Sequence, residues 1–273
     1  MKPKGIKGLK GRDQVGCVVS VGVKSEKGFP TETDRWHIVN PREEAGIRHL
    51  HPAFQAFNTA RPDLRKVLKG NIVHAHMDDC FEHHLKAQVI KSPAHPNKKP
   101  QCVGDGVNAV RWIGPGPDDF KNIKCPHDLC EFRQKKPPLC KPWMRFLFKV
   151  RWQEGSPLPT PLAKFTSGAW NTTANFKGFF DSFYEAAKNL NIENPQMFGL
   201  PFIMSLAYQT KPSAKSKFPV VTISSEVDPI DFFLAQRKNM DAISAPFEQI
   251  TAESEQENEV IYEDQKAISF GGK

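Results

Sequence analysis

The chain has 273 residues and a net charge of +8, with 39% hydrophobic residues and six cysteines. This length is enough to bury a sizeable core in one large domain or two small ones, so disulfides are not needed for stability. No run of about 18 apolar residues occurs, and the basic N-terminus has no apolar stretch typical of a signal peptide. We therefore expect a cytosolic protein with reduced thiols and no membrane partner.

The positive charge is concentrated in the body of the chain. Residues 248–273 hold seven acidic residues and two lysines, which leaves 36 basic against 23 acidic residues in 1–247, a net charge of +13. A body this basic can bind a polyanion by releasing counterions, and an acidic tail can compete for the same surface or recruit a basic partner. The alternative is a basic protein without a polyanion ligand. We expect residues 248–273 to be a disordered acidic tail.

The N-terminal quarter predicts an arm, a hairpin and short helices, in that order. The first twelve residues hold five basic side chains and no acid, so residues 1–15 are expected to form a flexible basic arm. The β-branched run 16–24 and the run RWHIV at 35–39 are separated by Gly, Pro and Asp, which predicts a β-hairpin. Residues 51–68, with apolar side chains around two prolines, predict short helical pieces.

A histidine-rich segment follows at residues 71–85, NIVHAHMDDCFEHHL. It superficially resembles the H-x-H-x-D-H ligand run of metallo-β-lactamase-type hydrolases, but its final position is Asp79 rather than His, and no downstream set completes two metals. The alternative is that His74 and His76 line the exposed face of a strand. No dinucleotide-binding, P-loop, nucleophile-elbow or kinase motif occurs, so we expect that the protein is not an enzyme.

The next segment combines proline, glycine and cysteine. Between residues 92 and 142, nine prolines and four glycines leave little room for regular elements, yet Cys102, Cys125, Cys130 and Cys140 all lie there. A segment with so few apolar residues needs another source of order. Four thiolates in the pattern C-x22-C-x4-C-x9-C match the ligands of a closed tetrahedral Zn²⁺ site.

Two alternatives to this ligand set stay open. His127 lies between the second and third of these cysteines and could replace one of them. The four could also be scattered free thiols, as we expect for Cys17 and Cys80, which lie in apolar surroundings. The GDGVNA stretch at 104–109 does not open a predicted helix, so we expect a turn beside the metal rather than a phosphate-binding loop.

The run from Trp143 to Trp152 alternates in a way that predicts a strand with one apolar and one basic face. Basic side chains on that face would be about 7–14 Å apart, comparable with phosphate spacing along a nucleic acid strand. An aromatic ring beside them offers bases a stacking surface. We predict a nucleic-acid-binding surface made of Lys141, Trp143, Arg145, Lys149 and Arg151. The alternative is an ordinary half-buried strand whose solvent face happens to be basic.

The last elements are two helices and a strand. Residues 173–190 predict an amphipathic helix with a stripe of phenylalanines, capped by one of the residues 171–173. Residues 218–227 predict a strand. Asp228 and Pro229 then open a second helix that runs to about Met240, with Asp as cap and Pro at the first helical position.

This order of elements predicts an α+β domain at residues 16–247. We expect a small antiparallel sheet or OB-like barrel, with an inserted four-cysteine zinc-binding segment at about 92–142 and two flanking helices.

Several stretches together resemble a phage protein family. They are VGCVVSVGVK, GFPTETDRW, LKGNIVHAHMDDCFEHHLKAQVI, QCVGDGVNAVRW, IKCPHDLCEF, LCKPWMRFLFKV and KFTSGAWNTTANFKGFF, followed by a strand near PVVTISSE. Over about residues 11–227 the chain is similar to the recombination directionality factor-like proteins of phages, whose actinophage-type members make a serine integrase run in reverse. By position, Cys102, Cys125, Cys130 and Cys140 match the cysteines of that family's metal-binding segment. The longer acidic tail departs from the actinophage members.

The resemblance implies a zinc-binding accessory protein of phage DNA transactions, which acts in the host cytoplasm on a serine integrase and on DNA. A single-stranded DNA-binding replication protein is the alternative, because a basic-aromatic strand, a basic arm and an acidic tail ending in Ile268 and Phe270 are typical of such proteins. A metallohydrolase that uses His74 and His76 is the third hypothesis.

Overall fold

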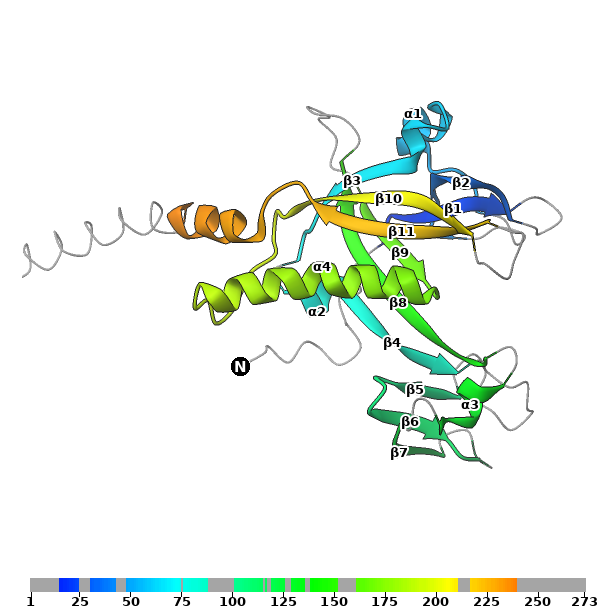
Figure 1. Ribbon diagram of the computed structural model, residues 1–273. Helices are drawn as coiled ribbons and strands as arrows, with labels where there is room; N and C mark the ends of the chain where they lie inside the picture. Colours follow the sequence, from blue (N-terminus) through cyan, green and yellow to red (C-terminus); the bar gives the residue numbers. More distant parts are fainter. Residues whose placement is uncertain are drawn as a thin grey trace, which may run out of the picture.

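A computed structural model describes residues 15–24, 30–42, 48–74, 76–87, 101–114, 116, 119–125, 129–135, 138–151, 161–210 and 217–239 (Figure 1). The predicted acidic tail, His127 and, apart from Val15, the predicted basic arm lie outside these residues. No helix in the described part of the chain is both long enough and apolar enough to cross a membrane.

Within the described residues, eleven strands form one mixed sheet. The strands are β1 (Cys17–Lys24), β2 (Pro30–Val39), β3 (Val67–Asn71), β4 (Phe81–Ala87), β5 (Cys102–Gly104), β6 (Asn108–Trp112), β7 (Phe120–Lys124), β8 (Cys140–Val150), β9 (Leu162–Ser167), β10 (Pro201–Thr210) and β11 (Lys217–Ser225). The helices are η1 (Pro52–Phe54), α1 (Gln55–Thr59), η2 (Leu64–Lys66), α2 (Met77–Cys80), α3 (Glu131–Gln134), α4 (Trp170–Asn189) and an unlabelled helix at 229–239.

The long strand β8 is shared by two parts of the sheet. One edge of β8 pairs with β4 over its first half and with β3 at its end, and the other edge pairs with β9. The body of the molecule therefore runs β2-β1-β9-β8-β3-β10-β11, and a lobe runs from β8 through β4, β5 and β6 to β7 (Figure 1). We call residues 101–139, with β5, β6, β7 and α3, the lobe.

The expected α+β class is confirmed, but the expected small antiparallel sheet or OB-like barrel is wrong. The sheet is large and mixed, because β1 and β9 pair in parallel, and it is not a closed barrel. The outer edge of β2 is occupied by Asn58 of α1, whose side chain accepts from the Ile38 amide at 2.9 Å and donates to the Ile38 carbonyl at 2.8 Å. On the opposite edge, Asn175 of α4 donates to the Val221 carbonyl of β11 at 3.0 Å. Side chains thus occupy backbone groups that barrel closure would need.

The body is held together by aromatic packing between the sheet and α4. Phe146 of β8 contacts Phe176 and Phe180 of α4, with ring centroids 5.3 and 5.9 Å apart, and Phe202 of β10 at 5.1 Å. The Phe stripe predicted for this helix is buried, as expected. The helix begins at Trp170, three residues earlier than predicted, and the predicted side-chain cap is wrong: Ala169 holds the N-cap position without a side-chain cap bond.

The remaining predictions for regular elements have mixed outcomes. The hairpin of β1 and β2, the short helices at 52–66, the strand β11 and the second helix are confirmed, and Asp228 Oδ1 accepts from the Ile230 amide at 2.8 Å as the predicted cap. The segment at 92–142 was expected to be irregular. In its described part it forms the lobe, a meander of three short strands with one helical turn.

Candidate nucleic-acid interface and cysteine cluster

Strand β8 separates an apolar side from a basic side, as its sequence predicts. Its even-numbered residues from Cys140 to Val150 are buried, and Phe146 packs on α4. Its odd-numbered residues point to the opposite side, because successive side chains of a strand alternate. Lys141 and Lys149 are exposed there and Trp143 is half-buried, whereas Leu147 is buried and interrupts the predicted basic stripe.

Neighbouring strands add basic residues on the same side. Residues that are directly opposite in a ladder point to the same face, and Lys86 of β4 is opposite Lys141, while Lys164 of β9 is opposite Leu147. Lys69 of β3 lies beside Arg151. We call this set the basic face; it consists of Lys69, Lys86, Lys141, Arg145, Lys149, Arg151 and Lys164, with Trp143 among them.

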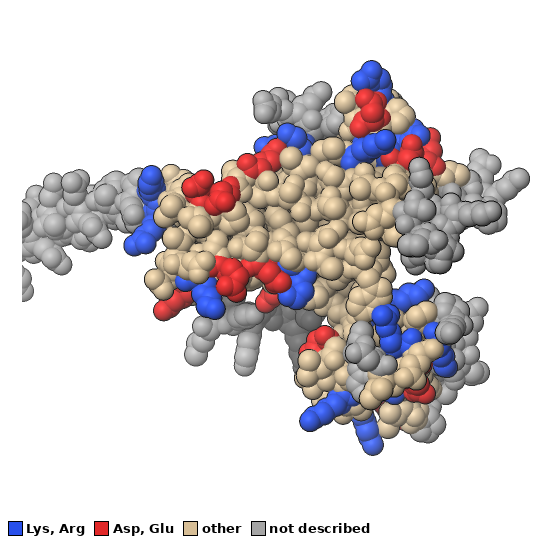
Figure 2. Space-filling view, in the orientation of Figure 1, with Lys and Arg blue, Asp and Glu red and all other residues tan. Residues whose placement is uncertain are grey.

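The basic face is on the side of β8 away from α4, and α4 passes in front of β8 in Figure 1. It is therefore turned away from the viewer in Figure 2. The side that Figure 2 does show is largely uncharged over β10 and β11, with Lys and Arg side chains around the lobe. The helix-covered side and the basic face therefore differ in chemistry.

Two carboxylates hold part of the basic face by ion pairs in the described part of the chain. Glu82 lies 3.1 Å from Arg145 Nη2, and Glu226 lies 2.9 Å from Lys69 Nζ and also pairs with Arg151. Three of the seven cations are thus partly neutralised. The side chains of Lys69 and Arg145 still have 51% and 41% of their surface exposed. An incoming phosphate can therefore reach them.

Two of the remaining cations, Lys86 and Lys164, lie close to other positive charges. Burial lowers the pKa of Lys164, and the neighbouring charges of Arg48 and Arg145 lower it further. Burial also lowers the pKa of Lys86, an effect that Glu82 opposes and Arg145 reinforces. Positive charges that repel one another in the free protein are stabilised by an anion placed among them.

Trp143 is less available for stacking than the sequence suggests. Lys86 Nζ lies 3.5 Å from the centre of its ring, and the imidazole of His84 lies 4.7 Å away at a tilt of 31°. A nucleobase that stacks on this ring from the same side has to displace one of these neighbours. Trp143 lies on the same side of β8 as the cations, as predicted, but the sequence did not predict its contacts with Lys86 and His84.

Lys69, Lys86 and Lys164 were missed because their strands were not predicted. Each lies in a short run, VLKGN, FEHHLKA or LAKFTS, whose residues do not alternate cleanly between apolar and polar. LAKFTS comes nearest to the alternation that predicts a strand, since Ala163 and Phe165 are buried on either side of Lys164.

The four cysteines predicted as ligands lie in one small apolar cluster. Cys102 of β5 and Cys140 of β8 flank the same residue of β4, Ala87, and Cys130 precedes α3. These three are 7–8% exposed and pack with Phe132, and Cys125, at the end of β7, packs against the group. All are free thiols. We call them the cysteine cluster.

The cluster and the basic face are on opposite sides of the same strand. Cys140 is the first residue of β8 and belongs to its even-numbered, buried side, whereas Lys141 begins the basic side. The cluster therefore packs against the start of β8 on the side opposite the basic face. By contrast, Cys17 and Cys80 belong to the main core and are at most 1% exposed, in agreement with the expected apolar surroundings.

Burial raises the pKa of three of these thiols, those of Cys102, Cys125 and Cys140. Burial raises the pKa of Cys140 to about 11, with further contributions from Cys130, Cys102 and Cys125. The pKa of Cys125 is raised by burial and then by Cys102 and Cys130. A cation that binds here must displace protons, as Zn²⁺ does at cysteine sites.

The cluster fits a zinc site in the number and chemistry of its donors. Four thiols are the ligand set of a closed structural Zn²⁺ site, and they come together from four separate segments. In the described residues, however, no three His, Cys, Asp or Glu side chains are already spaced to hold a metal ion. That geometric result covers the histidine-rich segment as well, apart from the undescribed Ala75. His74 lies in an irregular connection rather than on the strand suggested as an alternative.

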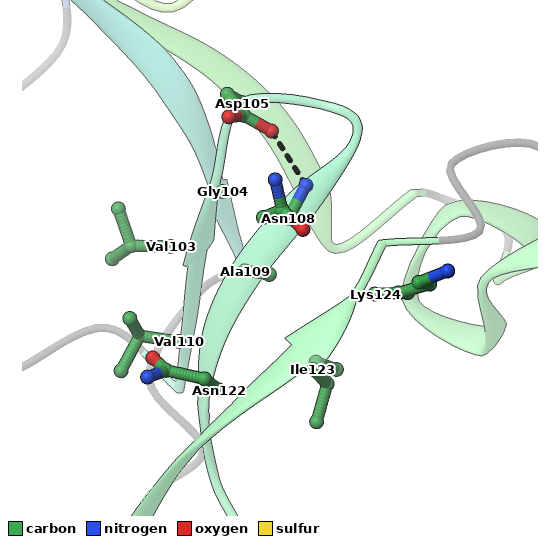
Figure 3. Close-up of a pocket in the computed structure, with 9 residues that line it drawn as sticks. All are labelled: Val103, Gly104, Asp105, Asn108, Ala109, Val110, Asn122, Ile123 and Lys124. Carbon is green, nitrogen blue, oxygen red and sulfur yellow. Dashed lines mark hydrogen bonds between the residues drawn. The ribbon is translucent and has the colours of Figure 1, made fainter.

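The GDGVNA stretch forms the turn expected from the sequence. Asp105 Oδ1 accepts from the amides of Val107 and Asn108, both at 2.7 Å, and Gly106 has φ of +102°. Figure 3 shows the bond between Asp105 and Asn108. The turn borders a hollow of about 610 Å³ on the lobe. Because a carboxylate already occupies these two amides, they are not free to bind phosphate. The turn also contacts the cluster, since the Cys125 amide donates to the Val107 carbonyl at 2.7 Å.

The fold and the site together define an α+β protein with an open mixed sheet, a basic sheet face and a cysteine-rich lobe. Comparison of the chain with protein-family models, with curated proteins and with solved structures finds no match.

Proposed function

We propose that the protein is a non-enzymatic nucleic-acid-binding factor that uses the basic face. The observation that carries the proposal is the gathering of seven cations and one tryptophan on the side of β8 and its neighbours that lies opposite α4. Neighbouring strands are about 5 Å apart and alternate residues of one strand about 7 Å apart, so several of these cations can contact successive phosphates of one strand.

We also propose that Cys102, Cys125, Cys130 and Cys140 bind Zn²⁺ as thiolates. A bound Zn²⁺ supplies a structural cross-link, and no reaction step passes through it. The four cysteines would tie β5, the end of β7, the start of α3 and the start of β8 together. Because Cys140 and Lys141 are adjacent, this cross-link would fix the strand that carries the basic face.

The specific role that we propose is an accessory factor of phage DNA recombination, similar to a recombination directionality factor that acts on a serine integrase. The support is the order of motifs from the β1–β2 hairpin to the FTSGAWN stretch, together with the cysteine spacing. Both partners of such a factor, the integrase and its DNA, would be in the host cytoplasm.

A single-stranded DNA-binding replication protein is the second candidate. The half-buried Trp143 within the basic face favours it, because base stacking between cations is a common mode of single-strand binding. The sheet is not a closed barrel, so the OB-like core expected for such a protein does not support this candidate.

Binding assays with the purified full chain test these roles. Tight, length-dependent and salt-sensitive binding to oligo-dT, in excess of binding to a duplex of equal length, would favour replication. Capture of a serine integrase together with weak binding to naked DNA would favour recombination control. Absence of salt-sensitive binding to either DNA form would contradict the basic face as a nucleic-acid interface, and metal analysis of the same preparation tests the zinc site separately.

A further inference from the structure

The side chain of Arg111 lies against the cysteine cluster. Its Nη2 donates to Cys130 Sγ at 3.3 Å, and its residue is directly opposite Cys102 in the β5–β6 ladder. The guanidinium carbon is 4.5 Å from the centre of the Phe132 ring, and Nη1 donates to Glu131 Oε1 at 3.2 Å. With only 21% of the side chain exposed, this cation is held beside the sulfur atoms by neighbours on three sides.

The charge of the cluster explains why such a cation matters. Four thiolates around one Zn²⁺ carry a net charge of −2 in a group of residues that is otherwise apolar. A cation within hydrogen-bonding distance stabilises that charge strongly in a partly buried site, because solvent screens it poorly. Groups that hydrogen-bond to metal ligands also orient them.

We propose that Arg111 is the positioning residue and charge partner of the cysteine cluster, and that its guanidinium stabilises the four thiolates of the Zn²⁺-bound form. This inference rests on the zinc site in the proposed function and adds a fifth residue to it. Arg111 does not ligate the metal. It raises the affinity for Zn²⁺ by its hydrogen bond to Cys130 Sγ and by offsetting the negative charge of the metal-bound cluster.

The lobe offers a matched control for this role. Arg133 of α3 is another partly buried arginine, but its guanidinium lies over the ring of Trp170 at 4.6 Å, which is part of α4. Its substitution changes the net charge of the lobe by the same amount. The charge of Arg133 also acts on Cys140, so the comparison isolates what the hydrogen bond of Arg111 to Cys130 adds to a nearby positive charge.

The experiment measures the Kd for Zn²⁺ alone by competition with a chromophoric chelator. It uses the full chain as wild type, Arg111→Met, Arg111→Lys and Arg133→Met. We expect Arg111→Met to weaken Zn²⁺ binding about 10- to 100-fold, the range found for outer groups of metal sites. Arg111→Lys should restore most of the loss because it keeps the charge, and Arg133→Met should change the Kd less than about 3-fold. A purely structural arginine would not be rescued by lysine, because lysine loses the stacking on Phe132.

Equal Kd values for wild type and Arg111→Met would overturn the inference, and so would equal losses in Arg111→Met and Arg133→Met. If Arg111→Met fails to fold, a Kd of Arg111→Lys within about tenfold of wild type supports the inference and a larger loss overturns it. A wild-type chain that binds no Zn²⁺ would instead remove the proposed zinc site itself. Nucleic-acid binding is measured separately, and its outcome does not decide the role of Arg111.

Discussion

The body and the lobe of this protein achieve order in different ways. The body buries a continuous cluster of large side chains, in which Phe146, Phe176, Phe180 and Phe202 contact one another around β8 and α4. The lobe shares a small buried cluster of two alanines, one phenylalanine and three cysteines with β4 and β8, which contribute Ala87 and Cys140. A large apolar core such as that of the body suffices for stability. A cluster as small as that of the lobe is too small to order a segment alone. The proposed Zn²⁺ site would supply the order that this small cluster does not provide.

Removal of the metal is expected to give the largest effect and to affect only the lobe. Structural Zn²⁺ in small cysteine sites contributes about 10–16 kcal/mol of apparent binding free energy, so a chelator or Cys140→Ser should abolish the amide-exchange protection of β5, β6 and β7. Strands β10 and β11 should keep their protection. Cys80→Ala, which removes a thiol from the main core, serves as the control and should retain stoichiometric zinc. Unchanged exchange in the lobe after complete zinc removal would contradict the dependence on metal.

The converse experiment weakens the body. Phe146→Ala removes a fully buried ring that contacts α4 and β10, and should lower the free energy of unfolding by about 3–5 kcal/mol in urea titrations. Phe132→Ala, the corresponding change in the lobe, should lower zinc affinity and leave the unfolding midpoint of the body nearly unchanged. If the two variants destabilise the body equally, body and lobe are one cooperative unit and the contrast between them is wrong.

Release of the cations from their carboxylate should strengthen nucleic-acid binding. Glu226→Gln frees both Lys69 and Arg151, and we expect about a 3- to 10-fold gain in affinity for an oligonucleotide at low salt. Fluorescence anisotropy measures the change. Asp63→Asn is the matched control, because it frees Arg61 outside the basic face and should leave affinity unaltered. A gain of the same size in both variants would point to net charge rather than to this surface.

The smallest expected effect is a dependence of DNA affinity on pH, caused by protonation of His84. Burial lowers the pKa of His84 below 6.5, and the nearby charge of Lys86 lowers it further, although Glu82 opposes this. The side chain is therefore neutral at pH 7 and gains a proton only as the pH falls below that value. Bound phosphate favours the charged form, so affinity for DNA should rise about threefold between pH 7.5 and 5.5.

The same shift has the opposite effect on folding. Because the unfolded chain binds this proton more readily than the folded one, stability is lost as the pH falls from 6.5 to the lower pKa of His84 in the folded state. His84→Gln should remove the pH dependence of binding that is due to this residue. Identical pH profiles for the variant and the wild type would exclude His84 as its source.

The sequence predicted well those elements whose pattern is local. Alternation identified β8 and its two faces, the spacing of phenylalanines identified α4, and Asp228 marked the start of the last helix. It predicted poorly what depends on long-range pairing. The parallel contact between β1 and β9 joins segments about 145 residues apart, and nothing in either segment signals it. Without this pairing, the sequence suggested a small antiparallel sheet or barrel instead of the large mixed sheet.

The candidate site was predictable in part for the same reason. Spacing indicated four cysteines as one set, and the structure brings them together. The role of Arg111 could not be predicted, because it depends on the β5–β6 ladder placing this residue opposite Cys102. Lys69, Lys86 and Lys164 likewise join the basic face only through cross-strand register.

The most direct test compares the salt dependence of oligonucleotide binding in two triple variants of equal charge. One replaces Lys141, Arg145 and Lys149 of β8 with alanine. The other replaces three cations outside the strands of the basic face: Arg61 between α1 and η2, Lys188 of α4 and Lys238 of the helix at 229–239. We predict that the slope of log affinity against log salt falls by about one unit for each lost phosphate contact in the first variant and stays unchanged in the second. Equal slopes in both variants would contradict a nucleic-acid interface on the basic face.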